Sequence, residues 1–353
     1  MFHSLRSIAR PFSTALLLGL LAATLCLWLK TPLPWMIGPL LATAAARMSG
    51  HDLRCPVQAR EAGQWAIGTA LGLYFTPTVL KVLASYIGFI IVAVVFALVL
   101  GMVCGWLLHK LTGVDQTTAF FAMAVGGASE MATQAERHGA QIDRVAAAHS
   151  LRIMMVVIIV PFAFKFWNVH GLDAYVQGVR QVDVVGLLTL IMFTSAVAYA
   201  LRRLQLPNAW VIGPLIMTVA LTANGVNLSA LPQWMINGGQ LLIGTALGTR
   251  FTPAFLHTAP RYLAAVALCG LAAVLLAAGF ALGLAAWSGI NPATAILATS
   301  PGGIAEMSLT AKTLQLGVPI VTAFHVTRMV TLVLVIGPLF RFGKSLRRRL
   351  KPQ

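Results

Sequence analysis

Two glutamates in short apolar segments are the residues of this chain best suited to chemistry. Glu130 lies three residues after the pair Gly126-Gly127, and Glu306 lies three residues after Gly302-Gly303. An ionisable group inside a membrane costs about 2.5–3.5 kcal/mol on insertion scales, so such groups normally face a cavity and mark a functional site. Glycine pairs let the backbone leave helical geometry, which is tolerated at membrane depth only inside protein or beside water. The pattern predicts a substrate- or ion-binding tip, and the alternative is a structural carboxylate paired with a buried arginine.

A histidine and an arginine accompany each glutamate at a constant distance. His149 and Arg152 lie 19 and 22 residues after the first glutamate, and His325 and Arg328 lie 19 and 22 residues after the second. A spacing of three places the histidine and arginine on one helix face. We expect each Glu–His–Arg set to converge, with arginine neutralising the glutamate or clamping an anionic substrate and histidine relaying protons. The alternative is a buried Glu–Arg pair that only fixes helix packing.

The same repetition extends along most of the chain. Residues 32–40 (PLPWMIGPL) match residues 207–215 (PNAWVIGPL), and residues 63–72 (GQWAIGTALG) match residues 239–248 (GQLLIGTALG). All these blocks share an offset of about 175 residues. A strongly apolar chain duplicated in this way is typical of transporters that hold a site between two halves.

Two Gly-Pro pairs in the first of these blocks are candidates for helix kinks. Gly38-Pro39 and Gly213-Pro214 fall inside expected helices, where proline removes a backbone hydrogen bond. The freed carbonyls could coordinate a cation or a substrate, and the alternative is packing geometry. Glycines four residues apart in the second pair of blocks suit close helix contact, so we interpret them as packing residues.

Composition places the chain in a membrane. It has 353 residues, of which 58% are hydrophobic and 10% are charged, whereas soluble domains carry about 25% charged residues. The mean hydropathy is +0.84, and the apolar runs are continuous rather than alternating, which favours helices over strands. The net charge of +16 is typical of basic cytoplasmic loops, and no nucleic-acid-binding signature accompanies it.

Segment counting predicts an all-α polytopic membrane protein built from two inverted repeats, each of about five transmembrane helices plus one re-entrant segment. We divide the chain into a first membrane repeat (1–165), a linker (166–183), a second membrane repeat (184–340) and a basic cytoplasmic tail (341–353). The first apolar run could pass for a signal peptide. We interpret it as a helix, because the start of the second repeat matches it and cannot be cleaved.

The placement of basic residues predicts the inversion. Arg47, Arg54 and Arg60 follow the second apolar segment of the first half, whereas the matching loop 224–236 of the second half has no Lys or Arg. Inversion requires an odd number of crossings per half, so one segment enters and leaves on the same side. If the Gly-Gly-x-x-Glu segment has this role, the largest number of Lys and Arg residues lies on the cytoplasmic side. Both termini then lie on that side as well. The Gly-Thr-Ala-Leu-Gly segment is the alternative.

Other chemistry has little support in the sequence. The four cysteines lie far apart without a CxxC spacing, and the eight histidines are scattered. Walker, Rossmann and nucleophile-elbow patterns are absent from the sequence. We therefore expect no enzyme activity, no cofactor and no metal site.

The repeated blocks together resemble the bacterial membrane AbrB-like family over about residues 15–340. That family shares only its name with the soluble AbrB DNA-binding regulators. Its members look like inner-membrane proteins with a duplicated domain, and they have been labelled regulators of gene expression and ammonia monooxygenases. The resemblance implies no agreed substrate and no catalytic residues. A copper monooxygenase would need clustered ligands, and none is visible in the sequence.

These observations predict a multi-pass protein of the bacterial inner membrane that acts as a secondary transporter of a small solute, proton-coupled through the two glutamates. The two tips are expected to meet near the midplane and share a cavity. The first alternative is a membrane sensor or regulator that affects gene expression indirectly, through a bound ligand or a cytoplasmic partner; a channel is the second. The expected partners are the lipid bilayer and an unknown small molecule, without direct nucleic-acid binding, and homo-oligomerisation stays open.

Overall fold

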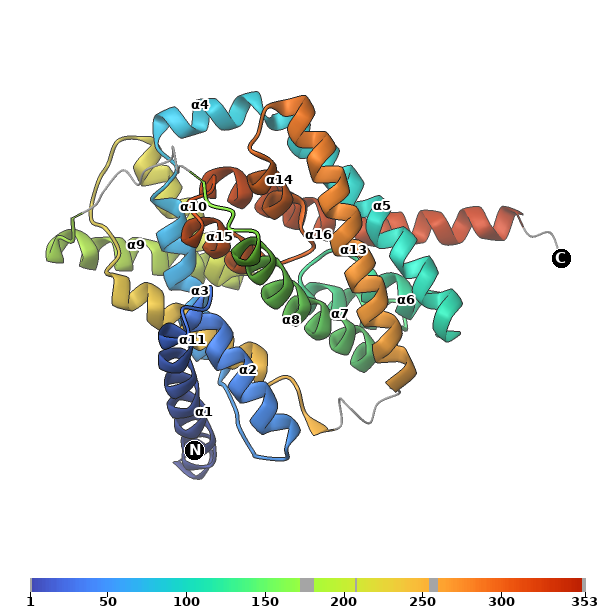
Figure 1. The fold of residues 1–353 in the computed structure, drawn as a ribbon, viewed down its shortest axis with the longest axis horizontal. Coiled ribbons are helices and arrows are strands. Elements are labelled where there is room, and N and C mark those ends of the chain that lie inside the picture. The colour runs from blue at the N-terminus through green and yellow to red at the C-terminus, as the bar shows by residue number, and fades with distance from the viewer. Residues whose placement is uncertain (1, 172–180, 207, 254–259, 351–353) are drawn as a thin grey trace.

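The computed structural model describes residues 2–171, 181–206, 208–253 and 260–350 of the chain (Figure 1). Parts of the predicted linker (172–180) and tail (351–353) lie outside the described residues. Within the described residues every regular element is a helix, as expected from the continuous apolar runs.

Six long helices run through the described part of the molecule. They are α1 (Phe2–Trp28), α5 (Ile87–Thr112) and α8 (Ile142–Phe166) in the first half, and α9 (Val184–Arg203), α13 (Pro260–Ser288) and α16 (Val318–Leu350) in the second. Each contains an apolar stretch long enough to cross a membrane. Helices α1 and α9 leave large apolar side chains uncovered, such as Leu21 (68% exposed) and Leu188 (63% exposed). Such faces suit contact with lipid, so the protein is a multi-pass membrane protein.

Four shorter helices pack together between the two halves. They are α2 (Pro34–Met48), α3 (Val57–Gly72), α10 (Ala209–Ala223) and α11 (Gln233–Gly248). Helix α2 packs on α11, α3 packs on α10, and α3 also packs on α11. Where α3 and α11 meet, a Cβ added to Gly63 would lie 2.7 Å from the carbonyl oxygen of Gly239. The duplicated glycine blocks are therefore the interface between the halves.

The two Gly-Pro pairs also lie at helix contacts. A Cβ on Gly38 would lie 2.6 Å from the carbonyl oxygen of Ala22 in α1, and a Cβ on Gly213 would lie 2.6 Å from Cα of Ala198 in α9. The pairs thus allow α2 to approach α1 and α10 to approach α9. Beyond the end of α3, helix α4 (Pro77–Ser85) turns away from it by 88°.

Each half contains a hairpin of two short helices that returns to its starting point. In the first half α6 (Gln116–Met123) and α7 (Ala128–Arg137) form the hairpin, and in the second half α14 (Pro292–Thr299) and α15 (Ile304–Thr313) form it. The backbone N–H of Gln141 donates to Oγ1 of Thr118 at 2.9 Å, so the chain leaves beside the point where it entered. Gly317 donates to Thr294 in the same way at 3.2 Å. These hairpins have the geometry of re-entrant segments and carry the Gly-Gly-x-x-Glu motifs.

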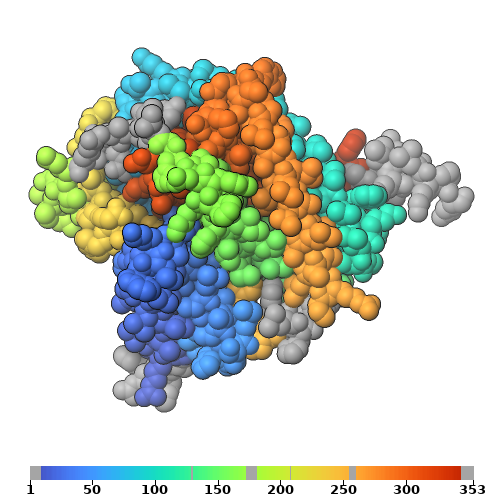
Figure 2. Space-filling view, in the orientation of Figure 1, coloured from blue at the N-terminus to red at the C-terminus, as the bar shows by residue number. Residues whose placement is uncertain are grey.

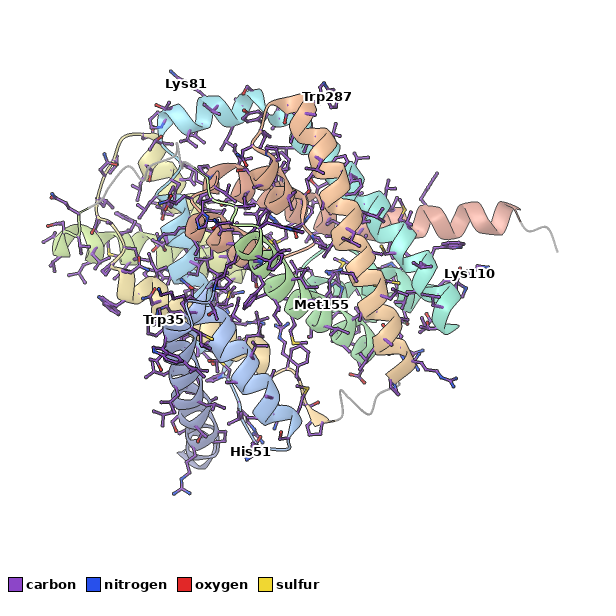
Figure 3. All side chains as sticks on the ribbon, in the orientation of Figure 1. Trp35, His51, Lys81, Lys110, Met155 and Trp287 are labelled. Carbon is purple, nitrogen blue, oxygen red and sulfur yellow. The ribbon has the colours of Figure 1, made fainter. Side chains whose placement is uncertain are left out.

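Contacts across the halves fit an inverted arrangement. Helices α5 and α13 run antiparallel, because Phe89 meets Trp287 (ring centroids 5.2 Å apart) and Phe96 stacks on Phe280 (3.9 Å). Figure 3 shows Lys81 and Trp287 at one end of the molecule and His51 at the other.

We call the end that carries His51 the basic end. It is defined by the arginines at the end of α2, around the start of α3 and at the ends of α9 and α11: Arg47, Arg54, Arg60, Arg202, Arg203 and Arg250. A salt bridge of 3.1 Å between Glu61 and Arg202 joins the two halves there.

In the space-filling view, α8 lies between the blue α1–α2 pair and the orange α13 (Figure 2).

Candidate functional site

The second glycine of each Gly-Gly pair makes room for the glutamate carboxylate. Gly127 and Gly303 immediately precede α7 and α15, and both have extended backbone. A Cβ on Gly127 would overlap Oε2 of Glu130, and a Cβ on Gly303 would overlap Oε2 of Glu306. Each carboxylate therefore folds back over the first turn of its helix, where the positive end of the helix dipole favours a negative charge.

The first glycine of each pair accommodates a methionine. A Cβ on Gly126 would lie 2.9 Å from Cε of Met131, and one on Gly302 would lie 2.8 Å from Cγ of Met307. Both methionine side chains are fully buried. The motif Gly-Gly-x-x-Glu-Met thus encodes one compact tip, with the methionine turned inward and the glutamate turned toward the helix start.

Arg152 and His149 on α8 hold the broken backbone of the first hairpin. Arg152 donates to the carbonyl oxygen of Ala124 at 2.9 Å and to Nδ1 of His149 at 2.9 Å. His149 donates from Nε2 to the carbonyl oxygen of Phe121 at 2.9 Å. This network assigns a neutral ring with its proton on Nε2, because Nδ1 accepts from the guanidinium. A second ring proton would bring two positive charges into contact.

The second hairpin repeats the arrangement with shorter bonds. Arg328 donates to the carbonyl oxygens of Ser300 (2.7 Å) and Gly302 (2.6 Å) and to Nδ1 of His325 (2.9 Å). His325 donates in turn to the carbonyl oxygen of Leu297 at 2.9 Å. The carbonyls at the end of a helix lack partners within it, so the buried guanidinium satisfies groups that would otherwise be costly to bury.

The structure therefore brings each histidine together with its arginine but engages the arginine with the tip backbone. Within the described part of the chain, neither Glu130 nor Glu306 makes an ion pair. The alternative of a buried Glu–Arg pair is thus not the arrangement seen. Nor do three His, Cys, Asp or Glu side chains come together as a candidate metal site among the described residues.

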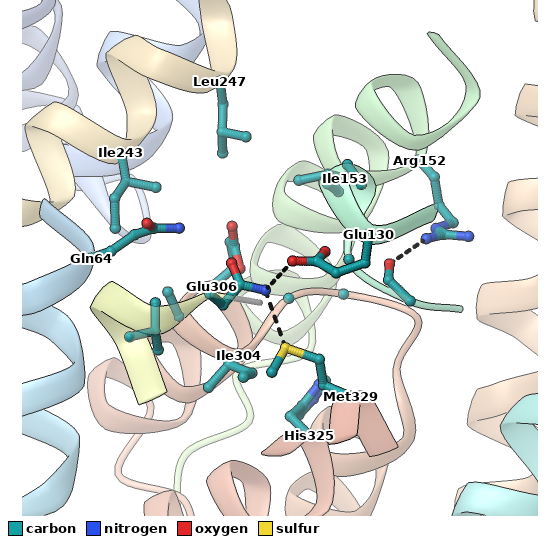
Figure 4. A pocket seen from close by; sticks show the side chains of 18 of the residues that line it. Gln64, Glu130, Arg152, Ile153, Ile243, Leu247, Ile304, Glu306, His325 and Met329 are labelled. Carbon is teal, nitrogen blue, oxygen red and sulfur yellow. Dashed lines mark hydrogen bonds between the residues drawn. The ribbon is translucent and has the colours of Figure 1, made fainter. Parts of the chain in front are cut away.

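Both tips face one cavity of about 130 Å³ between the two halves (Figure 4). Figure 4 shows Glu130 and Glu306 on its wall, with Ile243 and Leu247 of α11 across from them. Of the residues predicted from sequence, those on the cavity wall are Gly126, Gly127, Glu130, Arg152, Gly302, Gly303, Glu306, His325 and Arg328. His149 and the two Gly-Pro pairs do not line it.

Four polar residues on the cavity wall were missed from sequence: Arg60, Gln64, Asn208 and Arg250. Asn208 precedes α10 and donates from Nδ2 to Oε1 of Glu130 at 3.3 Å, which links the second half to the first tip. Of the four, only Gln64 is repeated in type in the other half, so duplication gives no indication of the other three. A spacing of four places Arg60 and Gln64 on one helix face. This spacing is the pattern in the sequence that indicates a shared polar face.

The counterparts of these four residues in the other half are buried. Each cavity residue is partly exposed. Ile236 (3% exposed) corresponds to Arg60, and Gln240 (7%) corresponds to Gln64. Leu33 (2%) corresponds to Asn208, and Tyr74 (6%) corresponds to Arg250. The cavity therefore lies toward the basic end, and the positions that would line its equivalent toward the opposite end are closed.

These features define a polytopic helical membrane protein with a polar cavity between two repeats, each of which contributes a hairpin tip. The family model described as transition state regulatory protein AbrB matches residues 35–344, so the chain belongs to the AbrB family. This confirms the resemblance predicted from the repeated motifs.

Two relatives match nearly the whole chain. The chain is 26% identical over 328 residues to "Putative regulator AbrB" of Escherichia coli (strain K12), which covers 92% of this chain and 94% of the relative. It is 24% identical over 333 residues to "Uncharacterized protein YhjN" of Bacillus subtilis (strain 168), with 87% and 86% covered. The similarity thus extends through both halves.

Proposed function

We propose that the protein is a secondary transporter of a small solute, which binds in the cavity between the two hairpin tips. The observation that supports this most is the asymmetry of the cavity in a chain whose halves fit an inverted repeat. Inverted repeats around a central site permit two states of equal topology, in which the halves exchange their local conformations. One state has the cavity toward the basic end, as seen here, and the other has it toward the opposite end.

The exchange requires side chains that are buried in this state to become accessible in the other. Leu33, Ile236 and Tyr74 are buried where their counterparts are partly exposed. In the second state they become accessible, while Arg60 and Asn208 become closed. A fixed binding protein has no need of this exchange.

Glu130 and Glu306 are the groups we propose for proton coupling. Both line the cavity and neither has an ion-pair partner among the residues described. A carboxylate in this position can change its protonation state without breaking a salt bridge. The neutral histidines, whose two ring nitrogens are both engaged, serve to position the arginines.

The basic end is proposed to face the cytoplasm of a bacterial cell, with the protein in the inner membrane. Basic loop residues favour the cytoplasmic side, and the arginines around the start of α3 and the end of α9 lie at this end. We also propose that both termini are cytoplasmic, as the distribution of basic residues along the sequence predicts.

Flux measurements test the transport proposal. Wild-type protein in proteoliposomes loaded with a pH-sensitive dye is exposed to a panel of small solutes. At least one solute should produce a dye response that is lost in the double variant E130Q/E306Q. Thermal stability of both proteins with the same solutes provides the control for folding and binding.

A membrane sensor is the second candidate, since the Escherichia coli relative carries the word regulator in its name. A solute that stabilises the wild-type protein without any flux, under every ion gradient tried, would contradict transport and favour the sensor.

A further inference from the structure

We propose that the cavity binds a small organic anion through a carboxylate group held between Arg60 and Arg250. This proposal rests on the cavity assigned above as the transport site and names the class of its substrate. Neither arginine has an arginine counterpart in the other half, so the repeat itself did not point to them.

The duplicated arginines are already committed to the protein. Arg152 and Arg328 donate to tip carbonyls and to their histidines, which fixes their guanidinium groups. They add positive charge to the cavity wall, but most of their donors are engaged. A ligand therefore has to find its direct partners elsewhere.

The positive charges of Arg60 and Arg250 are not neutralised by an ion pair among the described residues. In the part of the chain that the structure describes, neither forms an ion pair, and Nε of Arg60 is buried without a hydrogen-bond partner. Arg250 shares the cavity wall with Arg60, Glu130 and Glu306, and among the described residues no ion pair joins it to either carboxylate. Two arginines from different halves thus face the same space, each with donors to spare.

The charge of the cavity favours an anion. Its wall carries four guanidinium groups against two carboxylates. Helices α7 and α15 both begin at the cavity, and their positive ends add to the same field. Gln64 and Asn208 contribute amide groups to the same wall.

The shape and chemistry of the wall favour an organic carboxylate over an inorganic ion. The planar guanidinium fork matches a carboxylate with two parallel hydrogen bonds. Apolar side chains line the rest of the space, including Val211, Ile243 and Leu247. They suit a short hydrocarbon body.

Titration of the full-length protein in nanodiscs tests this assignment. The probes are sodium acetate, lactate and succinate, with inorganic phosphate, glycerol and choline chloride as comparisons. We expect at least one carboxylate to bind the wild type, and R60Q and R250Q to weaken it by tenfold or more. R54Q and R203Q are matched controls, because both remove an exposed arginine at the same end. Should R250Q fail to fold, R250K keeps the charge, loses the fork and should still weaken binding.

The outcomes separate the substrate class from the transport proposal. Unchanged carboxylate affinity in R60Q and R250Q would overturn the assignment, as would binding of phosphate, glycerol or choline in preference to every carboxylate. Carboxylate binding that depends on both arginines, without flux, would support the anion site and contradict transport. Flux of a neutral or cationic solute would leave transport standing and overturn the anion site.

Discussion

The carboxylate of Glu130 lies directly against Gly127 and occupies the space that a Cβ on this glycine would need. The pair Gly303 and Glu306 has the same relationship in the second half. The glycines are therefore required by the position of the acid as well as by the backbone. This explains why the two residue types recur at a spacing of three.

Alanine at Gly127 or Gly303 should displace the carboxylate from the start of its helix. We expect G127A and G303A to lower solute-driven flux tenfold or more, and to reduce the free energy of unfolding by about 1–3 kcal/mol from overpacking. G283A is the control, since a Cβ there meets no atom within 4 Å. Flux in proteoliposomes and thermal midpoints measure both effects. Full activity in G127A and G303A would show that the carboxylate position does not matter.

The contact between α3 and α11 gives a second pair of substitutions with opposite outcomes. In G63A the new methyl group meets the carbonyl oxygen of Gly239, which is backbone and cannot rotate away. We expect a loss of about 1–3 kcal/mol in unfolding free energy. Gly238, one residue before Gly239, has nothing within 4 Å, so G238A should be neutral or stabilise α11 by up to about 1 kcal/mol. Equal midpoints for G63A and G238A would contradict the close approach.

The sequence was sufficient to predict the helical membrane fold, the hairpin segments and most of the tip residues. These features repeat at a fixed offset, and hydrophobic continuity identifies each segment. Helices α6 and α7 were expected as one short segment, and the break between them follows from Gly126-Gly127. Hydrophobic continuity and duplication can be recognised in the sequence itself, without knowledge of the fold.

The partners of Arg152 and the role of Arg60 could not be predicted in the same way. Arg152 was expected to meet Glu130, but the unpaired carbonyls at the end of α6 bind its guanidinium instead. Arg60 was assigned to a basic loop, and Arg250 was not considered as a site residue. Their place on the cavity wall depends on how α3 and α11 pack between the halves, which is a tertiary property.

Arg328 should stabilise the fold through the hydrogen bonds of its guanidinium group and not through its positive charge alone. R328K keeps the positive charge but cannot reach two carbonyl oxygens and His325 at once. Leaving a buried acceptor unpaired costs about 1–3 kcal/mol, so we expect a lower thermal midpoint for R328K. R203K, at an exposed position, should leave the midpoint unchanged. A wild-type midpoint for R328K would show that charge, rather than the hydrogen-bond fork, is what the tip requires.

Asp115 gives a prediction for pH dependence, because the second half carries an amide at the same place. Asp115 precedes α6 and accepts from the backbone N–H of Thr118 at 2.8 Å and from Gln141 at 3.2 Å. Partial burial raises the pKa of Asp115, but these hydrogen bonds outweigh it, so the pKa lies below its ordinary value. Its counterpart Asn291 accepts in the same way from Ala293 and Thr294.

A carboxyl group whose pKa is lower in the folded state stabilises the protein above its unfolded pKa of about 3.9. That stabilisation is lost as the pH falls through the folded pKa. D115N should therefore keep the cap, as Asn291 does, and show a smaller loss of thermal midpoint between pH 6 and about pH 3 than the wild type. D115A should lose about 0.5–2 kcal/mol at pH 7, because it removes the cap itself. A pH profile of D115N identical to the wild type would show that Asp115 does not contribute to acid sensitivity, and a wild-type midpoint for D115A at pH 7 would contradict its role at the start of α6.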